Sequence, residues 1–445
     1  MERILERAKK HADMAEVYRI EKNAAPACFT GGELTALEGE ESVSTALRLI
    51  VDGRFGFSST THPDEVDELV DRAVDSAKFG PSADFEFSRQ VMHFGRGQYY
   101  DSRVAELKYE DLIQTGREMI DIVRTSFPDV NLEAEVTREA NRITIMNTLG
   151  GDIQFEKTMY QAFLNVLLIL ESDRAELEHT ASGTHLSRDP IQMARDAVWR
   201  FSQCSRVAPV RTKKMTVLFT SLAFRGLYVP LFYGLNGDNA FRKMSKLTGQ
   251  IGQHVLDSTI TVSDDATDPM LPASCPADDE GVITRKNTLI DRGILKGFFY
   301  DRRAAARAGA ESTGNGFKKS SLYTGFSIDT PPSPFPSNLV IDPGSIPRDE
   351  LIRGIKEGII VDDVMGAGQG NNLNGEFSMN VALGYKIENG EVVGRVKDVM
   401  VAGNVFDVFK NNLRGMSSEA FVEDTLFGRY KVPWIAFDEM PVSAT

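Results

Sequence analysis

Histidine, the commonest metal ligand among side chains, is scarce in this chain. Six occur in 445 residues: His11, His62, His93, His179, His185 and His254. No two have the H-E-x-x-H spacing that places two ligands on one face of a helix. The segment ELEHTASGTH, which contains His179 and His185, could hold a metal through a loop. A solvated polar turn between a strand and a helix is the simpler interpretation.

The three cysteines, Cys28, Cys204 and Cys275, lack the C-x-x-C spacing of metal and redox sites. An isolated thiol is by default buried or idle. Cys275 lies in PASCPADDEG, where the neighbouring carboxylates would raise the pKa of the thiol and not activate it. The odd, scattered set excludes a disulfide framework, so we expect a reducing, cytoplasmic location.

Acidic and glycine-rich segments are the other places where chemistry could occur. The cluster DDEG is expected to be a solvated loop, with a contact to a metal or an ammonium group as the alternative. The stretch GAGQG lacks the Lys-Ser/Thr of a phosphate loop, so it predicts tight turns. Six residues of such segments could line a cavity or form turns: Asp279, Glu280, Gly281, Asn371, Asn374 and Gly375.

The charge and hydropathy of the chain exclude two classes of function. Lys plus Arg number 50 and Asp plus Glu number 64, which gives a net charge of −14. An acidic chain repels phosphate backbones, so nucleic acid is not expected as a direct partner. No apolar run reaches the roughly 18 residues that a membrane span needs, and the charged N-terminus has no signal-peptide core.

The first half of the chain predicts helices followed by an antiparallel meander. Val43–Val51 and Phe55–Ser59 flank an Asp-Gly hairpin turn, and a helix is expected over about Val104–Ser126. Residues 80–103 are irregular in pattern. A further helix is expected over Ser187–Gln203. Between these helices lie four strand-like runs: Asn131–Glu139, Asn141–Asn147, Asp152–Lys157 and Tyr160–Leu170.

This order predicts an α+β protein of two domains and not a doubly wound sheet. The N-terminal domain, residues 1–205, combines helices with the meander sheet. A basic linker is expected at about 206–213. The C-terminal domain, 214–445, is expected to be mostly antiparallel β with short helices. Trp199 and Trp434 are interpreted as core or interface anchors.

Four segments together resemble the TldD/PmbA family. Gly53–Lys78 resembles the hairpin and helix near that family's start. The C-terminal half is similar over Asp278–Gly309 with STGNG just after it, over PSNLVIDPG (Pro336–Gly344), and over Asn374–Asn404. The resemblance implies a two-domain α+β protein that is cytoplasmic and dimeric around an enclosed cavity. It also implies a metallopeptidase system: TldD-type members cut unfolded or peptide substrates, and PmbA-type (TldE) members pair with them.

The residues at the family's metal-binding positions decide between these two types. The TldD pattern is H-E-x-x-x-H followed by G-D-F-N-R-K, and Gly237–Lys243 (GDNAFRK) matches the second part. The matching positions of the first part are Val229, Pro230 and Gly234, none of which can bind zinc. TldD members also carry a ligand cysteine near the C-terminus, and the last 40 residues here contain none. The resemblance therefore implies a TldE-like chain that is not catalytic alone, with no cofactor expected.

Three functions follow as hypotheses. The first is a PmbA/TldE-like subunit that completes a dimer with a TldD-type partner and holds an unfolded peptide, with strand edges available for β-addition. Net charge would favour basic peptides weakly. The second is an autonomous peptidase that uses Asp279, Glu280, His254 and Cys275. The third is a homodimer that binds peptides or a small ligand. The family's other name, modulator of DNA gyrase, implies an indirect effect through peptide cleavage.

Overall fold

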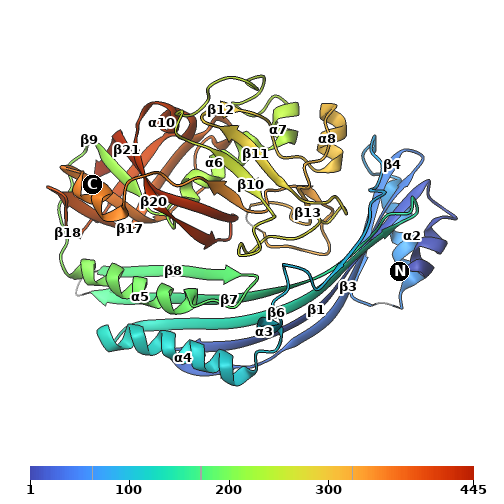
Figure 1. Ribbon diagram of the computed structural model, residues 1–445, viewed down its shortest axis with the longest axis horizontal. Helices are drawn as coiled ribbons and strands as arrows, with labels where there is room; N and C mark the ends of the chain where they lie inside the picture. The colour runs from blue at the N-terminus through green and yellow to red at the C-terminus, as the bar shows by residue number, and fades with distance from the viewer. Residues whose placement is uncertain (63, 171–172, 323, 445) are drawn as a thin grey trace.

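The computed structural model describes residues 1–62, 64–170, 173–322 and 324–444. Its architecture is α+β, and most of its strand pairs are antiparallel, as the sequence predicts. The long strands of the first sheet run across the lower part of Figure 1, and the second sheet with its short helices lies above them. No helix among the described residues is long and apolar enough to cross a membrane.

The first sheet has the order β4-β3-β1-β6-β7-β5, with β2 beside β1 and β8 beside β7. Its helices are α1 (Glu2–Ala8), α2 (Val66–Ala77), α3 (Ser102–Ala105), α4 (Tyr109–Ser126) and α5 (Asp189–Ser202). Its strands are β1 (Met14–Thr30), β2 (Glu33–Ala36), β3 (Glu40–Val51), β4 (Arg54–Thr60), β5 (Val91–Gly95), β6 (Asn131–Asn147), β7 (Asp152–Leu170) and β8 (Asp173–Gly183).

The second sheet has the order β12-β11-β10-β15-β21-β19-β17-β16-β9, with β18 beside β17 and β20 beside β21. Its strands are β9 (Lys213–Phe219), β10 (Val262–Asp265), β11 (Lys286–Asp291), β12 (Ile294–Leu295), β15 (Leu339–Ile341), β16 (Glu357–Met365), β17 (Glu376–Glu388), β18 (Glu391–Arg395), β19 (Val399–Asn404), β20 (Leu413–Asp424) and β21 (Arg429–Ala444). A separate ribbon joins β13 (Gly316–Phe317) to β14 (Ser333–Pro334). The helices are α6 (Arg225–Leu235), α7 (Gly237–Phe241), α8 (Arg302–Ala308), α9 (Arg348–Arg353), α10 (Val405–Asn411) and the 3₁₀ turns η1 (Gln203–Ser205) and η2 (Asn372–Asn374).

The four predicted strand runs are wrong in number, because they form only two strands, β6 and β7. One break fell at Ala140, a weak β-former, and the other at Thr158 and Met159. In the sheet, Ala140 pairs with Asn23 on one side and Thr158 on the other, so ladder hydrogen bonds on both sides keep the strand continuous. The predicted irregular stretch 80–103 likewise contains β5, which pairs in parallel with β7, and the short helix α3.

The polar turn predicted around His179 is also wrong, since this segment is the strand β8. It pairs with β7 from Asp173↔Leu170 to Gly183↔Tyr160. The sequence signal was an alternation of period two: Ala175 and Leu177 are buried, while Glu176 and Glu178 are exposed. His179 therefore projects from a strand and not from a solvated loop.

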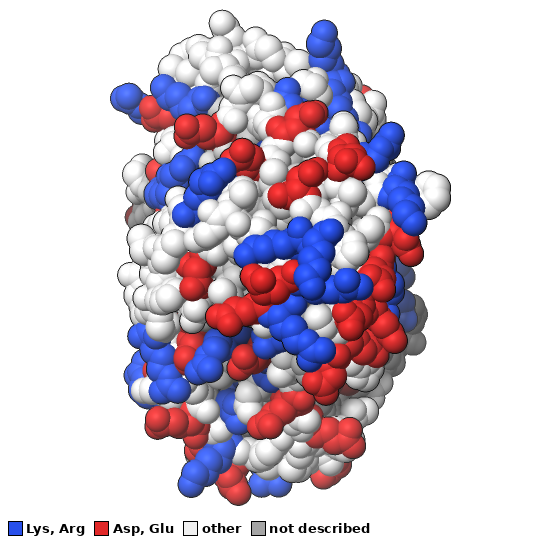
Figure 2. Space-filling view, turned by 90° about the vertical axis from the view of Figure 1, so that its right-hand side faces the viewer, with Lys and Arg blue, Asp and Glu red and all other residues white. Residues whose placement is uncertain are grey.

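Apolar side chains from both halves meet between the two sheets. One cluster combines Ile143, Ile145 and Phe155 of the first sheet with Cys275 and Ala277 of the second half. Helices α4 and α5 pack against each other and against the first sheet. The face shown in Figure 2 carries basic and acidic side chains interspersed with one another. The charge of the ligand that a cavity favours is therefore argued from the residues that line the cavity and not from the net charge of the chain.

Helix α4 approaches β1 so closely that only glycine fits at Gly116, because a Cβ there would overlap the buried ring of Phe29. Gly116→Ala gains about 1 kcal/mol of helix propensity but overpacks the contact, which costs about 1–3 kcal/mol. We expect the free energy of unfolding to fall by about 1 kcal/mol in urea denaturation. Arg117→Ala, at the next, exposed position of the helix, should change it by less than about 0.5 kcal/mol. A stabilised Gly116→Ala variant would contradict this packing.

Candidate functional site

A cavity of about 480 Å³ lies between the first sheet and the second half of the chain, and we call it the central cavity. Strands β1, β3, β6 and β7 supply one wall. The other wall comes from α6 and from loops around residues 272–279, 317–337 and 428–429. Aromatic and aliphatic side chains cover much of the surface. Eight charged residues also line it: Lys22, Lys157, Lys318, Lys319, Arg429, Glu40, Glu139 and Asp279.

The predicted acidic cluster borders this cavity, but it is not a solvated loop, which corrects that expectation. Asp278 is fully buried and accepts hydrogen bonds from the backbone N–H groups of Glu280, Val282 and Gly316, at 2.9–3.0 Å. Gly281 has a φ of +67°, a left-handed conformation that suits glycine. Together these features fold the segment into a tight turn that points its two following carboxylates in different directions.

Glu280 takes one direction, toward Arg48 of β3 in the other half of the molecule. The Arg48 guanidinium lies 2.5 Å from Glu280 Oε1, and its Nε donates to Glu16 at 2.7 Å. All three side chains are buried, with relative exposures of 5%, 1% and 1%. Burial raises the pKa of Glu16, and the facing Arg48 opposes that shift. Glu280 therefore contacts a guanidinium within an ion triad, which is neither the metal nor the ammonium group of the alternative interpretation.

Asp279 takes the other direction, into the wall of the central cavity. It accepts a hydrogen bond from the backbone N–H of Lys318 at 2.7 Å. Burial raises the pKa of Asp279, and the Lys318 contacts and Tyr18 hydroxyl oppose that shift. Burial and the neighbouring Asp279 also raise the pKa of Tyr18. The tyrosine therefore stays a neutral hydrogen-bond donor on the cavity wall.

Lys318 is a buried ammonium with almost no access to water, at 2% exposure. Its Nζ donates to the carbonyl oxygen of Thr330 at 2.9 Å and lies 4.7 Å from the ring centroid of Phe57. Burial lowers the pKa of Lys318 to about 7, although Asp279 opposes that shift. The lysine can therefore gain or lose its proton near neutral pH.

Lys157 presents a second ammonium to the cavity from β7. Its Nζ donates to the carbonyl oxygen of Ser274 at 3.4 Å, and burial lowers the pKa of Lys157. Neighbouring Cys275 is buried, which raises the pKa of its thiol to about 12, with Lys157 opposing the shift. A thiolate is thus disfavoured at neutral pH, so Cys275 is not suited to nucleophilic attack.

Helix α6 carries the three residues that the sequence resemblance predicts at the ligand positions of the metal motif. Val229, Pro230 and Gly234 are all buried in the core. Gly234 packs so tightly against the ring of Phe406 that a Cβ would overlap it. The helix contributes Tyr228 to the central cavity. Any side chain at 234, including a histidine, would have to displace Phe406.

The remaining predicted residues lie elsewhere. Asn371, Asn374 and Gly375 form the η2 turn, where the Asn371 side chain accepts from the Asn374 N–H at 3.3 Å and Gly375 has a φ of +86°. They lie outside the lining of the central cavity. His254 is exposed, and its carbonyl oxygen accepts from Lys410. Among the described residues, no three of His, Cys, Asp and Glu come together as a group that could hold a metal ion.

Sequence reasoning missed the basic residues of the site, and one of them left a signal. Arg48 interrupts the apolar run STALRLIV, and a charge within a buried strand usually has a partner. Lys318 and Lys319 lie just past the quoted STGNG segment, but nothing local shows that they enter a cavity. Their position depends on the β13–β14 ribbon, in which Phe317 pairs with Ser333, 16 residues further along the sequence.

Replacing Arg48 should break the ion triad. Arg48→Met leaves Glu16 and Glu280 buried without a counter-charge, so the free energy of unfolding should fall by about 3–5 kcal/mol. Arg48→Met/Glu280→Gln should recover part of this loss, because one buried charge is removed with its partner. Urea denaturation measures both effects, with exposed Arg54→Met as the matched control. Equal stability of Arg48→Met and Arg54→Met would disprove the role of the triad.

Lys318 should make stability depend on pH. Its pKa of about 7 in the folded chain lies below its ordinary value of 10.5, so the unfolded chain binds more protons between these values. Stability therefore rises with pH above about 7, by about 2 kcal/mol between pH 7 and pH 9. Lys318→Met should lose this increment, while exposed Lys356→Met should keep it. Urea denaturation at the two pH values is the measurement, and identical pH dependence in all three proteins would refute the assignment.

Comparisons with known proteins agree with this architecture. Residues 212–444 match the PmbA/TldA metallopeptidase C-terminal domain, and residues 15–77 match PmbA/TldA metallopeptidase domain 1. An uncharacterized protein of Methanocaldococcus jannaschii is 23% identical over 410 residues, which are 92% of this chain and 93% of that protein. The metalloprotease TldD homolog of Haemophilus influenzae is 32% identical over 184 residues, 41% of this chain and 36% of that protein.

Solved structures share the fold across the whole chain. The crystal structure of TldE from Thermococcus kodakarensis superimposes with a TM-score of 0.88 at 23% identity and covers 100% of both chains. A Thermotoga maritima protein described as a modulator of a DNA gyrase gives a TM-score of 0.83 at 20% identity, over 99% of both chains. Because the C-terminal domain match alone spans more than half of the sequence, the chain belongs to the PmbA/TldD metallopeptidase family.

Proposed function

We propose that this chain is the TldE-type subunit of a TldD/TldE metallopeptidase system. It pairs with a TldD-type catalytic subunit and holds an unfolded peptide that the partner cleaves. The observation that carries the proposal is the packing of α6: the residues expected at the ligand positions, Val229, Pro230 and Gly234, are buried, and Phe406 fills the space beside Gly234. A zinc site needs lone-pair donors at about 2.0–2.3 Å, which these side chains lack.

The central cavity is the proposed place for the peptide. Its aromatic and aliphatic walls suit the side chains of an unfolded segment, and its polar groups can fix the backbone. Five of its charged residues are basic and three are acidic. We therefore propose a preference for acidic peptides, in place of the weak preference for basic ones that the net charge of −14 suggested. Binding of the peptide by β-addition to a sheet edge stays a prediction.

The candidate set of an autonomous peptidase has little support in the geometry. Cys275 and Glu280 are buried, and Glu280 is engaged by Arg48. His254 is exposed and belongs to no group of potential metal ligands among the described residues. None of these residues has to take part in catalysis if the chain acts as a subunit that binds substrate and completes a dimer.

Mixing this chain with a purified TldD-type metallopeptidase tests the proposal. We expect the two to co-elute on size exclusion and the peptidase rate on an acidic, unfolded peptide to rise. The isolated chain should hydrolyse nothing. Chelator-sensitive hydrolysis by the chain alone would establish the autonomous peptidase instead. A stable homodimer that retains peptide and ignores the TldD-type protein would establish the binding protein.

The role of the cavity is tested separately with Lys157. Lys157→Met removes a cavity cation and should weaken binding of an acidic peptide about tenfold, which corresponds to about 1.4 kcal/mol. Lys356→Met changes the net charge by the same amount at an exposed position outside the cavity. This variant should bind the peptide like the unmodified chain. Fluorescence anisotropy with a labelled peptide measures both affinities. Equal weakening in the two variants would show that only the overall charge matters.

A further inference from the structure

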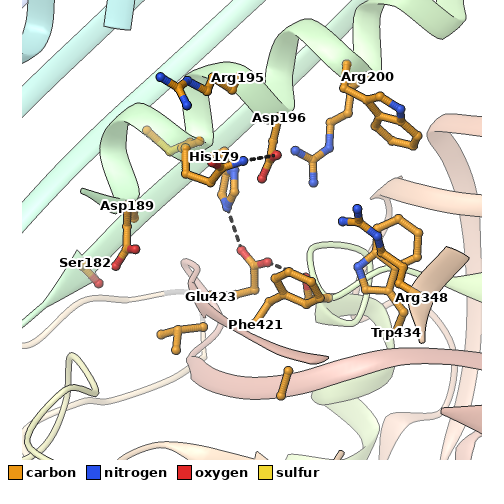
Figure 3. Close-up of a pocket in the computed structure, with 17 residues that line it drawn as sticks. His179, Ser182, Asp189, Arg195, Asp196, Arg200, Arg348, Phe421, Glu423 and Trp434 are labelled. Atoms are coloured by element: carbon orange, nitrogen blue, oxygen red, sulfur yellow. Dashed lines mark hydrogen bonds and ion pairs between the residues drawn. The ribbon is translucent and has the colours of Figure 1, made fainter. Parts of the chain in front are cut away.

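A second cavity of about 480 Å³ opens between α5 and β20, on walls that both halves of the molecule supply (Figure 3). Strand β8 and helix α5 contribute from the first half. Strands β20 and β21 and the first residue of α9 contribute from the second. We call it the Arg200–Arg348 pocket, after the two guanidinium groups directed toward its middle in Figure 3. It shares no lining residue with the central cavity.

The three carboxylates of this pocket each accept a hydrogen bond from another side chain, and that of Asp189 comes from Ser187 at 2.9 Å. Glu423 accepts from Ser221 at 2.6 Å and lies 2.8 Å from His179 Nε2. Asp196 accepts from the Gln192 amide at 2.9 Å. These donors are hydroxyl, imidazole and amide groups, and Arg200 adds a favourable electrostatic interaction with Glu423 and Asp196.

The arginines, by contrast, retain unused hydrogen-bonding capacity. Arg200 is 6% exposed, and its Nε donates to Asp362 at 2.8 Å, yet its Nη1 has no hydrogen-bond partner among the described residues. A buried donor without a partner costs about 1–3 kcal/mol. Arg348 stacks on Trp434, with its guanidinium carbon 5.3 Å from the ring centroid, and its Nε lies 3.8 Å from Asp349 Oδ1. The lining balances three arginines against three carboxylates, and the guanidinium of Arg348 keeps N–H donors that no described carboxylate within hydrogen-bond distance occupies.

Aromatic rings complete the lining. Trp434 and Phe421 lie with ring centroids 6.5 Å apart, and Trp199 packs edge-on against Tyr385 at 5.9 Å. Both tryptophans line the pocket, and they are the two tryptophans of the whole sequence. Such walls bind a flat or bulky apolar group, while a guanidinium fork matches a carboxylate.

We propose that the Arg200–Arg348 pocket binds a carboxylate joined to an aromatic or large apolar group, with the carboxylate on the guanidinium groups and the apolar group between the rings. Either a free aromatic acid or the C-terminal residue of a peptide has this chemistry. A ligand there contacts both halves of the molecule and holds them in one arrangement. The site does not depend on the partner proposed above, because all of its walls belong to this chain.

Tryptophan fluorescence reports this site directly, since both tryptophans line it. N-acetyl-phenylalanine is the probe for a free acid, and an acetylated tripeptide that ends in phenylalanine is the probe for a peptide terminus. Each is compared with its C-terminal amide. A saturable change with either acid, and at least about tenfold weaker binding of its amide, is the expected result. The tighter of the two acids identifies the source.

Two variants locate the carboxylate. Arg348→Met should weaken the bound acid about tenfold, whereas Arg353→Met, on the same helix but outside the pocket, should leave the affinity unchanged. Arg200→Lys keeps a charge beside Asp362 but removes the planar fork, and it should also weaken binding. Far-UV circular dichroism verifies that each variant is folded. Equal binding of acid and amide, no binding of either acid, or equal effects of the 348 and 353 substitutions would overturn the assignment.

Discussion

Arg48 joins the two halves of the molecule through a guanidinium that contacts both Glu16 and Glu280 in a region closed to water. Removing charges from water is costly, and only good geometry offsets that cost. Glu280 lies in a tight turn of the second half, and Glu16 and Arg48 lie on paired strands of the first, opposite each other in the ladder. The ion triad is therefore a buried polar contact between the second half and the first sheet, beside the apolar cluster that also joins them.

The central cavity follows from this arrangement. Asp279 precedes Glu280 in the same turn, so fixing Glu280 on Arg48 directs Asp279 into the cavity wall beside Lys318 and Tyr18. The buried charges of the site are thus coupled to the contact between the halves. One turn, held by the Asp278 side chain, supplies both the triad and the cavity wall.

Helix α6 carries the residues on which the proposed function depends. The fold matches TldE from Thermococcus kodakarensis over the whole chain, yet Val229, Pro230 and Gly234 are packing residues here. Phe406 occupies the space beside Gly234, and Tyr228 carries the helix's contact with the cavity. The proposed binding role rests on this packing, and the two cavities are both places where side chains from distant segments meet.

Local pattern determined the fold class, the helices α4 and α5, and the identity of the residues at the family positions, because hydrophobic periodicity and residue type can be read within a short window. It did not determine where the strands β6 and β7 end, since pairing on both sides carried them through weak β-formers such as Asn141. Nor could it show that the Asp278–Glu280 segment is buried, because Arg48 lies 232 residues from Glu280. Both cavities required the tertiary structure for the same reason: their charged groups come from segments that only the packing of the two halves brings together.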